Sequence, residues 1–407
     1  MRYFLVAVLF LKLVTSLLGQ SASDPSPRST KDFGHSLERY KIDGLKKHRS
    51  LPNGDASTDD VIKVRTDLIV NNFLVTDKSG SKISNLERGD FLVLEDGEPQ
   101  TIELFSIGEG SYVPCSIVLV IDSSALQAFY LNKSFNAAKL FIDKLERGDR
   151  MAIVSADTKL RTDFTNNKSL LKKSLDLLET KGAEFGSGAE FSTLLAVLNE
   201  LFTGNDIKNR MPIVIVQGDG NEMLWLKPDS EIPYPVSKSL RQDNGMRFTG
   251  RKSLRDFGFG EIKIAIENSR ATIYSIIPGY DFIGLSKKER SAHALSIFDN
   301  TARTLGFQER NLPLLRRQFA ERDAEVRTAG QSALVKVADL SGGLTRFLEK
   351  PEDADRVYAD IFSNIKDRYS IGYYPTDQRQ TGKRRQIRIE VKGHPEYTIT
   401  GRKSYIY

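Results

Sequence analysis

The chain has 407 residues, of which 40% are hydrophobic and 28% charged, with a formal net charge of +6. These values indicate an ordinary soluble globular protein of two or three domains. The basic tail GKRRQIRIEVKG alternates apolar and polar residues like a half-buried strand, and no nucleic-acid-binding motif accompanies it, so we expect no nucleic-acid partner.

Residues 1–20 have the layout of a secretory signal peptide. Arg2 precedes an apolar run, and small residues follow near Gly19. An uncleaved membrane anchor is the alternative, but Lys12 interrupts the run and the segment is short for a span. We therefore expect cleavage, a periplasmic or secreted cell-surface protein, and no membrane span in the mature chain. The only cysteine, Cys115, allows no internal disulfide, so a large core must supply the stability.

Residues 21–60 are rich in Ser, Pro, Asp, Lys and Gly, which predicts a disordered linker. Residues 61–110 then alternate apolar and polar side chains between Asp-Gly and Ser-Gly turns, which predicts an N-terminal β segment. This segment is too short for an independent sandwich, so we expect its partner strands to come from elsewhere in the chain.

The stretch SIVLVIDSSAL, residues 116–126, predicts the central strand of an α/β domain. Its five consecutive apolar residues fit a strand that is buried on both faces, as in a parallel sheet covered by helices. Amphipathic helices and buried strands alternate after it, and a second apolar strand, PIVIV, leads into QGDG. We predict a doubly wound, mostly parallel, Rossmann-like sheet over residues 114–367, with insertions at 222–260 and 286–339.

Residues 368–407 return to a β pattern with the runs YSIGYYPT, RQIRIEV and EYTITGRKSYIY. Neither this C-terminal β segment nor the N-terminal one is large enough to close a core alone. We predict that the two segments pair in a small β-sandwich-like domain, with the α/β domain inserted between them.

These features together resemble the von Willebrand factor type A fold. The domain carries Asp-x-Ser at Asp122 and Ser124, and Asp219-Gly220 follows a later buried strand. The flanking segments VTDKSGSKISNLERGDFLVLEDGEPQTIELF and LSGGLTRFLEKPEDADRVYADIFSNIKDRYSIGYYPT are similar to the exported bacterial "VWFA-related" proteins of the Acidobacteria type. The resemblance extends from about residue 61 to residue 405.

The resemblance implies a metal-ion-dependent adhesion site, in which Asp-x-Ser-x-Ser, a Thr and an Asp hold Mg²⁺ or Ca²⁺. Oxygen ligands suit such cations, and a partner carboxylate can then replace a bound water. Asp122, Ser124 and Asp219 match three of the ligand positions, whereas Leu126 stands at the third position of the motif and has no oxygen. The Thr position falls near Phe191 in GAEFSTLLAVLNEL, and a register shift would bring in Ser192 or Thr193 instead. We therefore expect a degenerate site, and the sequence leaves metal binding open.

No pattern of catalytic residues stands out. The four histidines are scattered without metal-ligand spacing, and the sequence has neither a Gly-x-Ser-x-Gly elbow nor a phosphate-binding loop ending in Lys-Ser/Thr. We expect a non-enzymatic adhesion or protein-interaction module that binds protein partners at the strand-end loops. The alternative is a metal-independent structural or assembly component of the cell envelope that binds through the two insertions. The sequence leaves the partner and the oligomeric state open.

Overall fold

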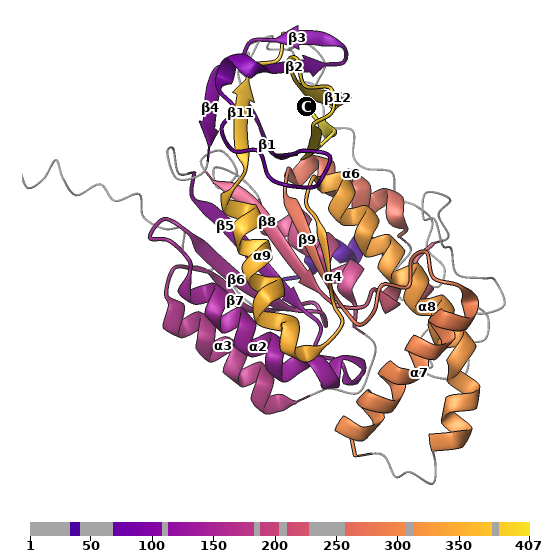
Figure 1. The fold of residues 1–407 in the computed structure, drawn as a ribbon. Helices are drawn as coiled ribbons and strands as arrows, with labels where there is room; N and C mark the ends of the chain where they lie inside the picture. The colour runs from indigo at the N-terminus through magenta and orange to yellow at the C-terminus, as the bar shows by residue number, and fades with distance from the viewer. Residues whose placement is uncertain are drawn as a thin grey trace, which may run out of the picture.

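The computed structural model describes residues 33–40, 68–107, 113–182, 188–202, 210–227, 257–306, 312–376 and 382–407. The predicted signal peptide lies outside these residues. The chain forms an α/β domain and a β-sandwich, which contact each other (Figure 1). This arrangement confirms the predicted fold class, a mostly parallel sheet inserted in a small sandwich.

The α/β domain is built on one six-stranded sheet with β5 near its centre. Each residue of β5 is buried, as its unbroken apolar sequence predicts. Neighbouring strands are parallel except at one edge, where β7 runs antiparallel to β6. In spatial order the strands are β10 (Thr345–Leu348), β9 (Thr272–Pro278), β8 (Met211–Gln217), β5 (Cys115–Ile121), β6 (Arg150–Ser155) and β7 (Lys159–Thr165).

Helices cover both faces of this sheet. Alternate side chains of β5 enter different cores: Ile117, Leu119 and Ile121 pack on one face, and Val118 and Val120 pack on the other. The first face is covered by α2 (Ala128–Asp143), α3 (Lys168–Lys181) and α9 (Ala354–Lys366). The second face is covered by α4 (Glu190–Glu200), α6 (Phe259–Ser269) and α8 (Leu312–Ser341). Among the described residues, the other helical elements are η1 (His35–Tyr40), α7 (Lys287–Thr304), η2 (Arg88–Asp90), η4 (Ala125–Gln127), η6 (Asn221–Trp225) and η8 (Pro351–Asp353).

The sandwich consists of two four-stranded sheets that share one apolar core. Both sheets combine strands from before and after the α/β domain. One sheet has the order β13 (Thr398–Gly401), β1 (Ile69–Thr76), β11 (Tyr369–Tyr373) and β4 (Leu104–Ile107). The other has the order β14 (Ser404–Ile406), β12 (Arg384–Val391), β2 (Phe91–Glu95) and β3 (Glu98–Gln100).

Part of the predicted disordered linker is folded, which corrects the prediction for residues 33–40. This segment contains η1 (His35–Tyr40) and packs on α4, with Leu37 buried in the main core. The carboxylate of Glu200 accepts hydrogen bonds from the backbone N–H groups of Gly34 and Ser36, both at 2.9 Å. The overall composition of residues 21–60 predicts disorder, because a single buried leucine contributes little to it. The contacts that order this segment come from Glu200, far away in the sequence.

The predicted insertions are smaller than expected. Residues 228–256 of the first lie outside the described residues, but Phe257 and Phe259, near its end, are core residues. In the second, α7 and α8 form a helical hairpin, and α8 ends as a core helix with Ala333, Leu334 and Val337 buried against the sheet. The charged amino-terminal half of α8 dominates the sequence pattern there and conceals this apolar spacing.

The sandwich and the ends of the central strands lie at opposite edges of the α/β sheet. The sandwich lies beyond the edge where β5 begins, and the α7–α8 hairpin lies toward the other edge (Figure 1). Arg402 of the sandwich region donates to the backbone carbonyl of Arg270 at 2.7 Å, and Ser404 donates to Glu267 at 2.8 Å. In the described part of the chain, no helix is long and apolar enough to cross a membrane.

Candidate functional site

Three acidic side chains meet at the carboxyl edge of the sheet. Asp122 follows β5 directly, Asp219 lies two residues after β8, and Glu190 is the first residue of α4. The carboxyl ends of adjacent parallel strands lie side by side, so the loops after β5 and β8 are neighbours. We call Asp122, Glu190 and Asp219 the acidic triad.

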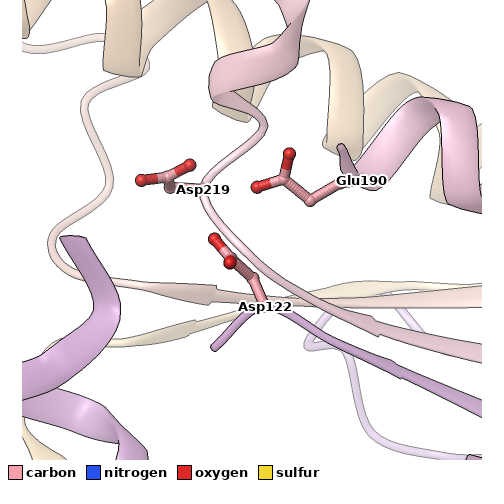
Figure 2. A group of neighbouring side chains, drawn as sticks. All are labelled: Asp122, Glu190 and Asp219. Atoms are coloured by element: carbon pink, nitrogen blue, oxygen red, sulfur yellow. The ribbon is translucent and has the colours of Figure 1, made fainter. Parts of the chain in front are cut away.

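The triad has a geometry that fits one cation. Its carboxylates point toward a common space (Figure 2), and one oxygen from each lies within 4.8 Å of the others. Two oxygens on one cation lie up to about 4 Å apart for Mg²⁺ and about 5 Å apart for Ca²⁺. Among the described residues, this is the one group of three or more His, Cys, Asp or Glu side chains close enough to share an ion.

The triad is buried, which is unusual for three carboxyl groups. Asp122 and Asp219 are each 2% exposed and Glu190 is 0% exposed. Burial and the neighbouring carboxylate of Asp219 raise the pKa of Asp122 from its ordinary value of 3.8 to about 7. Burial, followed by the charges of Asp122 and Asp219, raises the pKa of Glu190 well above its ordinary value. Burial also raises the pKa of Asp219, against the opposing effect of Arg327. Without a cation, the site therefore favours bound protons.

The three carboxylates differ in their hydrogen-bond donors. Asp122 accepts from the N–H of Ser124 at 2.8 Å and from its hydroxyl at 3.0 Å. Asp219 accepts from the side chains of Gln127 at 2.8 Å and Asn221 at 2.7 Å. Neither carboxylate oxygen of Glu190 has a hydrogen-bond partner in the part of the chain that the structure describes. A buried carboxylate without donors is costly, so Glu190 requires either a proton, which it can share with Asp122 or Asp219, or a bound cation.

Two glycines allow the backbone to approach the triad closely. A Cβ atom on Gly188 would lie 2.9 Å from the carboxyl carbon of Asp122, and one on Gly218 would lie 2.9 Å from Cγ of Glu190. Any side chain at these positions would enter the space that the carboxylates occupy. The site therefore requires glycine at positions 188 and 218, as well as the three residues that supply carboxylate oxygens.

The structure brings together only some of the residues predicted from the sequence. Asp122 and Asp219 belong to the triad, and Ser124 contacts it through Asp122. Ser192 instead donates its N–H and hydroxyl to Glu222, and the hydroxyl of Thr193 contacts that of Thr158 at 3.1 Å. The remaining two residues stand at ligand positions of the predicted motif. Phe191 is a core residue, and Leu126 is 38% exposed.

Sequence reasoning missed Glu190. It stands one residue before Phe191 at the start of α4, where an acidic side chain ordinarily faces solvent and complements the helix dipole. The available signal was its position immediately after the glycine-rich loop, since Gly188 and Ala189 permit close packing there. Part of that loop, residues 183–187, lies outside the described residues.

Comparison with known proteins yields distant structural likeness. No family model matches the chain, and no curated protein sequence matches it. The chain is similar to the solved structure of an aerotolerance-related membrane protein from Bacteroides fragilis, at 10% identity and a TM-score of 0.35, covering 61% of this chain and 98% of that one. It is similar to the vWF domain of the type V pili tip protein Mfa5 from Porphyromonas gingivalis, at 14% identity and a TM-score of 0.35, covering 63% and 96%.

A third likeness is to the solved structure of proximal thread matrix protein 1 from the mussel byssus with a zinc-occupied MIDAS motif. The identity is 12% and the TM-score 0.31, covering 62% of this chain and 48% of that one. TM-scores this low do not establish a fold by themselves. The assignment of a doubly wound α/β fold therefore rests on the strand order and on the helices that cover both faces of the sheet.

Proposed function

We propose that this chain is a von Willebrand A-like protein-interaction module that binds a divalent cation at Asp122, Glu190 and Asp219. The orphaned carboxylate of Glu190 carries this proposal, because a cation supplies the positive partner that the described protein groups do not. The oxygen-only donor set suits Mg²⁺, Ca²⁺ or Mn²⁺. When bound, the ion would neutralise the triad and fix the loops after β5 and β8.

The module acts outside the cytoplasm in this proposal. Residues 1–20 direct export to the periplasm or the cell surface, and the mature chain binds protein partners without a catalytic step. The sequence features for this are the signal-peptide pattern and the resemblance of the flanking segments to exported "VWFA-related" proteins. The partner surface is formed by the loops at the carboxyl edge of the sheet.

Thermal unfolding of the mature chain with and without Mg²⁺, Ca²⁺ or Mn²⁺ tests the cation site. A site filled at 100 times its dissociation constant adds about 2.7 kcal/mol of stability, which raises the melting temperature of a chain of this length by roughly 3–5 °C. The Glu190→Gln variant should lose this response. Glu200→Gln is the matched control. Glu200 is a carboxylate on the same helix, α4, but it binds residues 34–36 and does not belong to the triad. The absence of any shift with all three ions would contradict the proposal.

The burial of the triad favours a second candidate, a structural or assembly component that binds partners independently of metal. A cation enclosed at 0–2% exposure does not present itself to a partner carboxylate. The segment at residues 228–256 is then the surface to test. The N–H of Lys227 donates to the carbonyl of Phe257 at 3.1 Å, so a short linker can close a deletion between these residues.

Binding to a cell-envelope extract distinguishes the two candidates. If retained partners survive the deletion of residues 228–256 but disappear with Asp122→Ala, the strand-end loops are the binding surface. If the deletion removes them and Asp122→Ala does not, the structural candidate is correct.

A further inference from the structure

A buried arginine from α8 lies beside the acidic triad. Arg327 is 4% exposed, and its Nη1 atom lies 3.8 Å from Oδ2 of Asp219. Its Nε atom donates to Asp323 on the same helix at 2.7 Å. The positively charged guanidinium of Arg327 therefore lies next to the site proposed for the metal ion.

The fold holds α8, and with it Arg327, tightly against the site. A Cβ atom on Gly330 would lie 2.5 Å from the backbone carbonyl oxygen of Asp219, so the helix backbone touches this loop. The amide of Gln331 accepts from the N–H of Phe282 at 2.9 Å and donates to the carbonyl of Tyr280 at 2.8 Å. Since Arg327 lies one turn before Gly330, its guanidinium reaches Asp219 from a fixed helix.

Asp219 is also well supplied with other donors. Its Oδ2 accepts from Gln127 and Asn221, and its Oδ1 accepts from the N–H of Asn221 at 3.1 Å. Asp219 is thus prepared for a state without metal, whereas Glu190 is not. Two cations that share one carboxylate in a site shielded from water repel each other strongly.

We infer that Arg327 is an internal counter-cation that competes with the divalent ion for Asp219 and so sets the metal affinity of the triad. This inference rests on the proposed function, in which the triad binds a divalent cation. It assigns α8 a direct role at the site, that of keeping the affinity low. Wild-type protein then binds the ion more weakly than the same three carboxylates would without Arg327.

Calorimetric titration of the full mature chain with Mn²⁺ tests this inference. Arg327→Met, which removes the charge and keeps an unbranched apolar chain, should bind Mn²⁺ at least about tenfold more tightly than wild type. Arg327→Lys keeps the charge and should stay within about threefold of wild type. In an Asp219→Asn background, Arg327→Met should change the affinity by a different factor than it does in wild type, because both changes act on the same carboxylate–guanidinium pair and their effects are therefore coupled.

Each outcome is informative. Tighter binding by Arg327→Met, including binding where wild type shows none, supports the inference. If wild type binds Mn²⁺ and Arg327→Met binds it equally well or more weakly, the metal site is supported and the inference is wrong. Equal binding would mean that Arg327 does not affect the ion, and weaker binding would mean that Arg327 helps to hold it. If neither binds, both proposals fail. If Arg327→Met is unfolded without metal, refolding by Mn²⁺ supports the inference, and no refolding at concentrations that saturate wild type contradicts it.

Discussion

Glu95 in the sandwich and Glu190 in the α/β domain are both buried glutamates, at 4% and 0% exposure. The carboxylate of Glu95 accepts from the hydroxyls of Tyr373 and Tyr405, both at 2.7 Å, and from Nη1 of Arg385 at 2.6 Å. The carboxylate of Glu190 has no donor among the described residues and faces two further carboxylates.

The difference distinguishes a structural carboxylate from a binding one. Glu95 has a positive partner and two hydroxyl donors, so its burial is compensated inside the fold. Glu190 has the same chemistry and comparable burial, but its compensation must come from a proton or a bound cation. We therefore expect the two glutamates to respond to substitution in opposite ways.

The largest effect is expected for Glu95→Ala. This change leaves the buried guanidinium of Arg385 without its carboxylate, which costs about 3–5 kcal/mol of unfolding free energy. Denaturant unfolding measures the loss. Glu98→Ala, on the adjacent strand and exposed, is the control and should change stability by less than about 0.5 kcal/mol. A loss below about 1 kcal/mol for Glu95→Ala would show that this network is not structural.

A pH titration of stability should reveal the triad next. Because the pKa of Asp122 is about 7 in the folded protein against an ordinary 3.8, the metal-free fold binds more protons than the unfolded chain between these values. Metal-free stability should therefore fall by a few kcal/mol as pH rises from about 4 to about 7, then level off. Unfolding in a chelating buffer across this range measures it. A shallower fall over the same window in Asp122→Asn than in wild type would fit; an identical profile for both would contradict this assignment.

Gly330→Ala tests the contact that holds α8 over the triad. Its Cβ atom would enter the backbone of the Asp219 loop, so we expect a loss of about 1–3 kcal/mol. Gly260→Ala is the matched control in helix α6, because a Cβ there meets no atom within 4 Å. That control should be neutral or gain up to about 1 kcal/mol. Equal effects of the two changes in thermal unfolding would show that α8 does not pack closely on this loop.

The smallest effect is expected for Glu190→Gln without metal. Glutamine carries no charge and cannot repel the carboxylates of Asp122 and Asp219, so stability at pH 8 should stay constant or rise by about 1 kcal/mol. Denaturant unfolding in chelator, beside Glu95→Gln, makes the comparison direct: the Glu95 change should destabilise. A loss for Glu190→Gln as large as that for Glu95→Gln would mean that Glu190 has an internal partner.

The sequence predicts the framework of this molecule better than its site. Unbroken apolar runs such as residues 117–121 identify buried strands because a sheet covered on both faces leaves no polar positions. Asp122 and Asp219 were found because they follow such strands. Glu190 and Arg327 were not, since a charged residue on a helix ordinarily faces solvent. Arg327 is buried by the long-range contact between α8 and the Asp219 loop, and Glu190 by its close approach to Gly218; helical periodicity encodes neither contact.

Diffraction from crystals grown with Mn²⁺ tests the central claim most directly. The anomalous signal locates the ion independently of the protein atoms. We predict a peak enclosed by the carboxylates of Asp122, Glu190 and Asp219 in the wild-type protein, and none at that position in Glu190→Gln. A wild-type map with the three carboxylates in place and no peak between them, at Mn²⁺ concentrations that saturate any binding seen in solution, would contradict a cation site at the triad.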